Sequence, residues 1–254
     1  MTRGERNLDR RGFLRGAAVL TGAGLLGGGD LFAQNIAGPQ FRTVDPIDLP
    51  QDQPGAWTLN FAYTPVRILP VDTADKGRRV VWYMVYMVWN KSDTPQTFFP
   101  EMELVTKDVP ANYLDEPQPL VVKKIREIED PTGALNLHTC ISISKDRIPV
   151  TKPDSIPRAV YGVAVWPEVS EKSSKTNNFS VYVTGLSNGL ARALTESGDE
   201  IISRKTLQLD FTRPTDDRKH KLGDIVVNDN NGLGAEKWIY RATSRRKKDA
   251  APKE

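Results

Sequence analysis

Histidine and cysteine are the side chains of this sequence best suited to bind a soft metal ion, and they occur close together once, at His138-Thr139-Cys140. Residues two apart on a strand share a face, so the imidazole and the thiolate could bind one ion. Alternatively, Cys140 is a small buried apolar group and His138 a hydrogen-bonded neighbour. The chain has two histidines and one cysteine in total, which argues against most hydrolase triads and most zinc sites. We therefore expect no metal, and keep a small metal-binding protein that uses His138 and Cys140 as an alternative.

A pair of carboxylates is the second arrangement that could do chemistry, as in glycosidases. Glu101 and Glu103 would share one strand face, and Asp199 adjoins Glu200. Alternating acidic residues on a half-exposed strand usually form its solvent side. No serine lies in a Gly-x-Ser-x-Gly turn and no nucleotide-binding fingerprint follows a strand pattern. The sequence predicts no catalytic residue and no cofactor, and a secreted carboxylate-dependent hydrolase stays an alternative.

Three of the five tryptophans, Trp57, Trp166 and Trp238, lie near the ends of expected elements, where an indole ring can be exposed. Exposed aromatic rings can bind sugars by stacking against them. These three are the candidate ligand-binding residues. The alternative is that they form the edge of the core, where we expect Trp82 and Trp89.

The elements that position these residues are mostly strands. Residues 80–89 are apolar at every position and rich in β-branched and aromatic types, which predicts a strand buried on both faces. Residues 97–106 alternate, and we expect them to return as its antiparallel hairpin partner. In the segment 58–69, Pro65 and the following Pro70 indicate an edge strand or a bulge.

One helix is expected at 118–129, with Pro119 in its first turn and an apolar face that contains Leu120, Val121, Ile125 and Ile128. Polar turns separate further strand patterns at 135–143, 159–166, 179–184, 201–211 and 237–242. Many short strands with one helix predict an all-β sandwich rather than a repeated βαβ unit.

A resemblance makes this fold more specific. The run 81–105, which passes through Asn90-Lys91-Ser92 and returns through 98–104, resembles the first hairpin of Ig-like domains in uncharacterised exported bacterial proteins. It covers about a tenth of the chain, and segments at 130–133, 160–166 and 205–211 are similar to parts of such proteins. The resemblance implies a single Ig-like antiparallel β-sandwich and transfers no catalytic residue.

The N-terminus resembles a bacterial twin-arginine export signal. Arg10-Arg11 is followed by Phe13-Leu14 and then by an apolar run from Gly16 to Gly29. That run is shorter than the roughly 20 residues that span a bilayer, so we expect no stable membrane span. The resemblance implies export through the cytoplasmic membrane by the twin-arginine machinery, as a folded protein, to the periplasm or the exterior.

The chain therefore divides into a signal at 1–33, an extended linker at 34–55, a β-sandwich at 56–242 and a basic disordered tail at 243–254. Cleavage could also fall nearer Ala37. Loss of the signal lowers the formal net charge from +3 to +1, so we expect no nucleic-acid partner. The lone cysteine leaves no intramolecular disulfide to form.

These features together predict an exported, non-catalytic binding or structural module of the bacterial cell envelope. We expect its partner to be an envelope protein or a surface polymer. The conclusion depends on the export signal, the sandwich pattern and the missing catalytic motifs, and such a pattern does not name a ligand.

Overall fold

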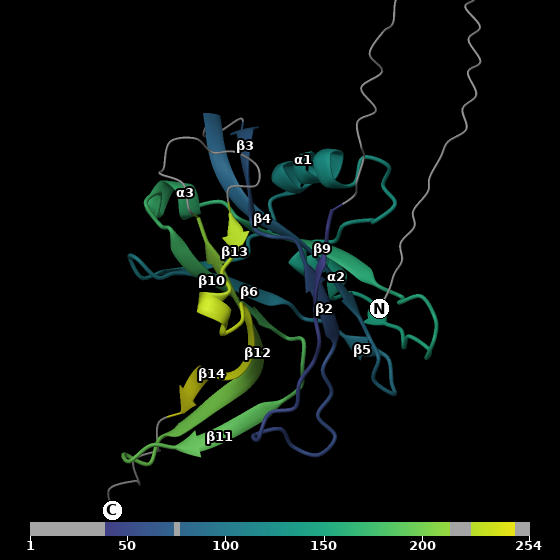
Figure 1. Cartoon of the computed structure of the whole chain (residues 1–254), viewed down its shortest axis with the longest axis vertical. Helices are drawn as coiled ribbons and strands as arrows, with labels where there is room; N and C mark the ends of the chain where they lie inside the picture. Colours follow the sequence, from purple (N-terminus) through teal and green to yellow (C-terminus); the bar gives the residue numbers. More distant parts are fainter. Residues whose placement is uncertain (1–38, 74–76, 214–224, 247–254) are drawn as a thin grey trace, which may run out of the picture. The chain divides into compact units, whose positions relative to one another are not determined.

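The computed structural model describes residues 39–73, 77–213 and 225–246. These residues form an all-β sandwich of two antiparallel sheets with three short α-helices (Figure 1). No helix in these ranges has the length and apolar character needed to cross a membrane. The expected signal peptide, with Arg10, Arg11, Phe13 and Leu14, lies outside the described residues.

The first sheet is built around one long strand, β4. The strands β2 and β3 pair with successive parts of one edge of β4, β9 pairs with the other edge, and β1 pairs with β2. Pro65 lies between β2 and β3, where Thr64 Oγ1 accepts a hydrogen bond from Val85 N at 3.3 Å, and Pro70 lies on the edge strand β3. The edge-strand prediction is thus confirmed at Pro70, while Pro65 lies in the connection between two strands. The strands of this sheet are β1 (Arg42–Val44), β2 (Asn60–Tyr63), β3 (Arg67–Thr73), β4 (Gly77–Trp89) and β9 (Val160–Trp166).

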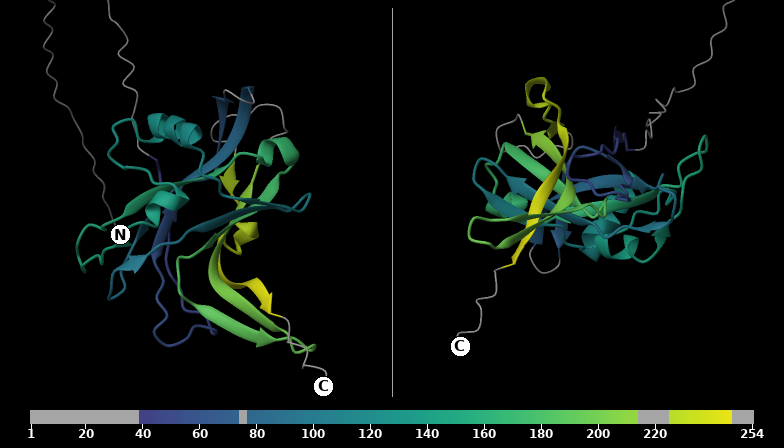
Figure 2. Two further views of the ribbon diagram at one scale, coloured as in Figure 1. Left: turned by 180° about the vertical axis from the view of Figure 1, so that it is seen from behind. Right: turned by 90° about the horizontal axis from the view of Figure 1, so that it is seen from below.

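The second sheet repeats this plan around β12. The strands β10 and β11 pair with one edge of β12, and β13 and β14 pair with the other. The parts of β11, β12 and β14 that pair together extend away from the sandwich as a three-stranded arm (Figures 1 and 2). The strands of this sheet are β6 (Glu101–Thr106), β7 (Ala111–Leu114), β10 (Asn178–Thr184), β11 (Leu190–Leu194), β12 (Glu200–Thr212), β13 (Val226–Val227) and β14 (Glu236–Arg246).

The predicted hairpin between 80–89 and 97–106 is wrong. Both edges of β4 are occupied, so the chain crosses after Trp89 and β6 pairs with β7 and β10 in the other sheet. At the crossing, β5 (Gln96–Thr97) pairs with β8 (Arg147–Ile148) in a separate two-stranded ribbon.

Aromatic side chains fill the space between the sheets. Alternate residues of β4 face the second sheet, and among them Trp82 contacts Phe179 edge-on with ring centroids 5.1 Å apart. Phe179 in turn stacks on Phe211 at 5.3 Å. This core is the main source of stability because the lone cysteine forms no disulfide.

The helix α1 (Pro119–Glu129) covers the outer face of the first sheet (Figures 1 and 2). Val121, Val122 and Ile125 pack against that face, which explains why the 80–89 run is apolar at every position and confirms burial on both sides. The expected helix face is partly wrong, because Leu120 and Ile128 are 66% and 42% exposed.

The helix is turned so that its last residue, Glu129, is buried. The carboxylate of Glu129 accepts hydrogen bonds from Tyr83 Oη at 2.6 Å and from the guanidinium of Arg67. These two bonds, which no periodic pattern encodes, fix the rotation of α1 over the sheet.

The strand predicted at 135–143 is wrong. Only His138 forms a bridge, with Gly162, and the chain then enters the short helix α2 (Cys140–Ile143). Thr139 and Ser142 form a capping box, which favours a helix start over a continued strand. The remaining short helices are α3 (Val169–Lys172) and the 3-10 turn η1 (Asn230–Gly232).

The other strand predictions are confirmed, since 159–166, 179–184, 201–211 and 237–242 lie in or largely within β9, β10, β12 and β14. The predicted boundaries at the two ends of the domain need correction. Residues 39–55 include β1 and belong to the folded domain, and residues 243–246 belong to β14. Residues 34–38 and 247–254 lie outside the described ranges.

Candidate functional site

The candidate site begins in the connection between β10 and β11, the two strands that pair with one edge of β12. Residues 185–189 turn away from the sheet and meet residues 57–59, where Leu59 N donates to Leu186 O at 2.7 Å. Gly185 has φ of 97°, and a Cβ there would lie 2.1 Å from the carbonyl oxygen of Phe99. A Cβ on Gly189 would lie 2.7 Å from Tyr240 Oη. This segment, which we call the 185–189 excursion, therefore requires glycine at both ends.

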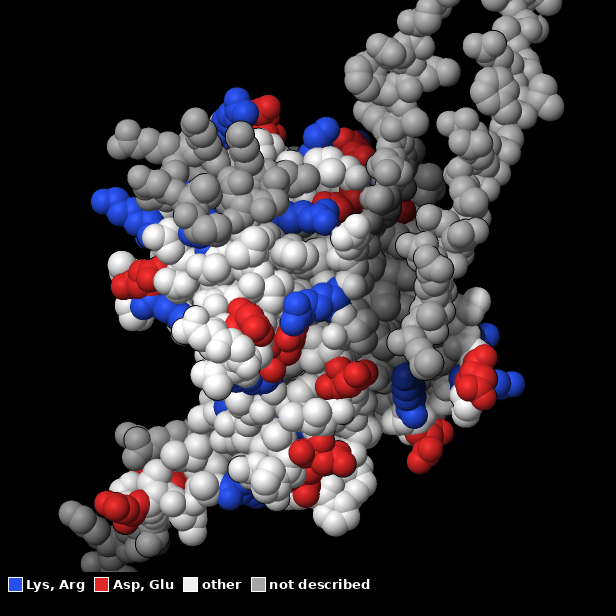
Figure 3. All heavy atoms as spheres, viewed as in Figure 1, with Lys and Arg blue, Asp and Glu red and all other residues white. Residues whose placement is uncertain are grey.

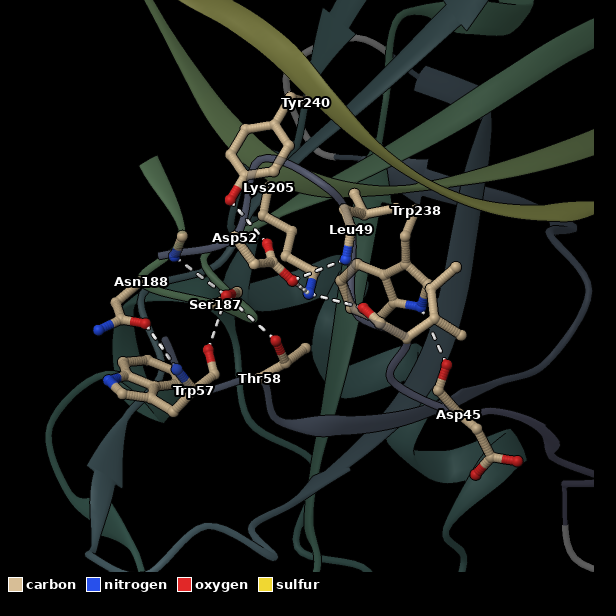
Figure 4. A network of polar contacts seen from close by, with 12 residues as sticks. Asp45, Leu49, Asp52, Trp57, Thr58, Ser187, Asn188, Lys205, Trp238 and Tyr240 are labelled. Carbon is tan, nitrogen blue, oxygen red and sulfur yellow. Dashed lines mark hydrogen bonds and ion pairs between the residues drawn. The ribbon is translucent and has the colours of Figure 1, made fainter. Parts of the chain in front are cut away.

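This excursion holds the backbone of Trp57 on both sides (Figure 4). Trp57 N donates to Asn188 Oδ1 at 2.8 Å, and Ser187 Oγ donates to Trp57 O at 2.6 Å. The indole is half-buried and packs in part against the inter-sheet core. The backbone of Trp57 is thus held in place in the absence of a ligand, which lowers the entropy cost of binding.

Trp57 borders a groove of about 710 Å³, within the range of about 300–1,000 Å³ typical of ligand sites. We call it the arginine groove because Arg147 of β8 and Arg204 of β12 line it, together with the 66% exposed ring of Phe99. None of the lining residues is acidic. The others are Thr94, Pro95, Gln96, Thr97, Gly185, Ser187, Asn188, Gly189 and Leu190.

A second groove of about 700 Å³ also borders Trp57. We call it the aspartate groove, because Asp45, Asp48 and Asp93 line it with Lys91 as the one basic residue among those that border it. The two grooves share Trp57, Thr94 and Gln96. Trp57 therefore borders two surface hollows of opposite charge.

A buried lysine anchors the loop that carries two of these aspartates. Lys205 Nζ lies 2.6 Å from Asp52 Oδ2 and donates to Ile47 O at 2.7 Å, and Tyr240 Oη donates to Asp52 Oδ1 at 2.7 Å (Figure 4). Burial of Asp52 opposes its ionisation, but the hydrogen bonds from Lys205, Leu49 N and Tyr240 outweigh it and lower the pKa of the carboxyl. Burial and the Asp52 carboxylate raise the pKa of Tyr240 to about 12.

The other two candidate tryptophans do not reach a groove. Trp166 is completely buried and its Nε1 donates to Met102 O at 3.3 Å. Trp238 is 6% exposed and its Nε1 donates to Asp45 O at 3.0 Å. Trp57 is half-buried and borders both grooves, whereas Trp166 and Trp238 are core residues.

His138 and Cys140 do not share a strand face, because Cys140 begins α2. The imidazole of His138 lies 3.2 Å from Ser142 Oγ. Burial and the neighbouring Asp115 carboxyl raise the pKa of the Cys140 thiol to about 12, so the thiolate that a metal requires is disfavoured. Within the described ranges, no group of three or more histidine, cysteine or acidic residues is placed to hold a metal ion.

The predicted carboxylate pairs occupy other positions. Glu103 is ion-paired with Arg241 and Glu200 with Arg192, while Glu101 is exposed. Neither pair borders the two grooves. On the face shown in Figure 3, acidic and basic side chains are interspersed over the described surface.

Sequence reasoning missed Phe99, Arg147 and Arg204 as site residues. They come from three separate segments that meet only because β5 and β8 pair beside the 185–189 excursion. The glycines at the ends of that excursion were the available signal. Comparison with protein-family models, with curated proteins and with solved structures finds no match to this chain.

Proposed function

We propose that this protein is an exported, non-catalytic module of the bacterial cell envelope that binds a surface polymer through the arginine groove. The observation that carries the proposal is the placement of Trp57, whose backbone is fixed by Ser187 and Asn188 and whose ring borders two open hollows. A rigid aromatic ring beside short hydroxyl and amide side chains suits a ligand that stacks and hydrogen-bonds at once.

The backbone of the 185–189 excursion favours a ligand that contacts side chains. A peptide that adds a strand needs a row of free backbone groups at a sheet edge. In this excursion, Leu186 O accepts from Leu59 N, Gly189 N donates to Ser187 Oγ, and Gly189 O accepts from Lys205 N. These groups are already used, so this part of the groove offers a ligand mainly side chains.

Export is supported by the resemblance of Arg10-Arg11-x-Phe13-Leu14 to a twin-arginine signal. A single cysteine and a large apolar core suit a cargo that folds before it crosses the membrane. Cleavage after Ala33 or Ala37 would leave β1, which begins at Arg42, intact. The proposed location is the periplasm or the exterior, and an Ig-like relationship stays part of this proposal.

Binding to an insoluble polymer fraction of the bacterial envelope, measured by co-sedimentation of the mature protein, tests the function. We expect Trp57→Ala to abolish most of the binding. Tyr182→Ala is the matched control, because Tyr182 is a half-buried aromatic residue that borders neither groove. Equal binding by wild type and Trp57→Ala would contradict the proposal, as would binding that survives enzymatic removal of the polymer and follows a protein instead.

A further inference from the structure

We infer that the ligand of the arginine groove is a polysaccharide whose sugar rings carry carboxylates, and that Arg147 and Arg204 bind those carboxylates. This inference depends on the proposed function. It adds the chemical class of the ligand and the residues that select it.

The first argument is the state of the arginines near the groove. On the arm, Arg192 pairs with Glu200 at 3.3 Å, and Arg241 pairs with Glu103 while its guanidinium lies 4.1 Å from the centroid of the Tyr182 ring. Arg204, which is exposed, forms no ion pair within the described part of the chain, although it stands directly opposite Arg241 in the sheet register. Arg192 and Arg241 are thus neutralised by acidic side chains, whereas the charge of Arg204 has no such partner among the described residues and is available to an anionic ligand.

The second argument is the charge of the groove itself. Arg147 lines the groove from β8 and is likewise exposed with no ion pair among the described residues. No acidic residue lines this groove. Guanidinium groups bind carboxylates in a planar, two-bonded geometry, so two such groups in one groove suit a ligand with repeated carboxylates.

The third argument concerns the aromatic and polar side chains that line the same groove. Trp57 and Phe99 give the groove apolar surfaces, and Gln96, Thr97 and Asn188 line it with hydrogen-bonding side chains. An acidic sugar ring combines an apolar face, hydroxyl groups and a carboxylate, and these three features match the three kinds of lining residue.

The surroundings argue against a nucleic acid. Nucleic-acid binding depends on many cations that follow the phosphate backbone. Here two arginines line the arginine groove, and Asp45, Asp48 and Asp93 line the neighbouring groove. The described grooves therefore lack the series of cations that a phosphate backbone requires.

The test is affinity electrophoresis and calorimetry of the mature protein with polygalacturonate, with dextran as a neutral polysaccharide and polyphosphate as a phosphate polymer. We expect binding to polygalacturonate that weakens as salt is added, and little binding to dextran or polyphosphate. The double variant Arg147→Gln/Arg204→Gln should lose at least tenfold in affinity. Arg158→Gln is the matched control, because Arg158 is exposed and borders neither groove.

The outcomes separate this inference from the proposed function. Binding to dextran as tight as to polygalacturonate, lost in Trp57→Ala but kept in the double arginine variant, would overturn the inference and leave the function standing. Preference for polyphosphate would overturn the carboxylate assignment. If no polymer binds, in the envelope fraction or among these probes, both fail. Thermal unfolding of each variant shows whether a loss of binding reflects a loss of fold.

Discussion

Lys205 Nζ lies 2.6 Å from Asp52 Oδ2, and the lysine side chain is only 1% exposed. Removal of the negative partner would leave a buried ammonium group without its counter-charge. We expect Asp52→Asn to lower the free energy of unfolding by about 3–5 kcal/mol, measured by urea denaturation at neutral pH. Asp48→Asn, an exposed aspartate of the same loop, should change it little. Equal losses in the two variants would show that the buried pair is not the cause.

Gly162 lies against the ring of Tyr86, and a Cβ there would lie 2.3 Å from Tyr86 Cζ. We expect Gly162→Ala to destabilise the protein by about 1–3 kcal/mol, the usual cost of overpacking a core. In a Tyr86→Ala background the same change should cost much less, because the ring is gone. An undiminished cost in that background, measured by the same denaturation, would place the clash elsewhere.

Burial raises the pKa of Asp115 from 3.8 to about 6. Between pH 3.8 and about 6, the folded protein therefore holds a proton that the unfolded chain has released, so stability falls as the pH rises through this window. Asp115→Asn keeps an acceptor for Val165 N, which donates to Oδ1 at 2.7 Å. We expect this variant to be more stable than wild type by about 1–3 kcal/mol at pH 7.5 and similar to it at pH 3.5.

Asp108 is the control for the pH experiment. Hydrogen bonds from the backbone and side chain of Asn178 and from Asn177 N lower the pKa of Asp108 despite some burial. Asp108→Asn should therefore lower the stability above pH 4, the opposite direction to Asp115→Asn. Denaturation curves across the pH range that show the same direction for both variants would contradict the assignment of Asp115.

The rotation of α1 can be tested by two substitutions on adjacent turns. Ile125 is completely buried and Leu120 is 66% exposed. We expect Ile125→Ala to cost about 2–5 kcal/mol of unfolding free energy, and Leu120→Ala to cost less than about 0.5 kcal/mol. Similar costs for the two would favour the helix face that the periodicity alone predicts.

The export proposal predicts a change of location without a change of fold. Replacement of Arg10 and Arg11 by lysine should keep the precursor in the cytoplasm, because paired arginines define the signal that the sequence resembles. Cell fractionation with an antibody to the sandwich gives the location, and circular dichroism of the purified variant confirms the fold. Normal export of the double lysine variant would contradict the proposal.

Strands were predictable wherever burial imposes a pattern over several residues. The run 80–89 showed burial on both faces, although it did not show that a sheet covers one side and α1 the other. The strand prediction for 135–143 was wrong. The apolar residues of this segment alternate, but the capping box of Thr139 and Ser142 favours a helix start. A local hydrogen-bonding motif overrode a weak alternation.

The pairing of strands was harder to predict than their existence. The hairpin after β4 was expected because neighbouring strands usually pair, but β2, β3 and β9 occupy both edges of β4. The site was harder still. Trp57 was singled out by its type and position, whereas Arg147 and Arg204 become neighbours only through tertiary contacts that no local pattern records.

The contacts of residues 42–52 with the last strand have a consequence for synthesis. Arg42 pairs with Glu236, Trp238 Nε1 donates to Asp45 O, and Tyr240 Oη donates to Asp52. The ribosome makes β14 long after it makes residues 42–52. The domain therefore completes its fold only after β14 has emerged, and formation of such distant contacts is slow. Under the export proposal, the signal is available to the export machinery before the cargo is complete, so correct timing requires a delay between synthesis and export.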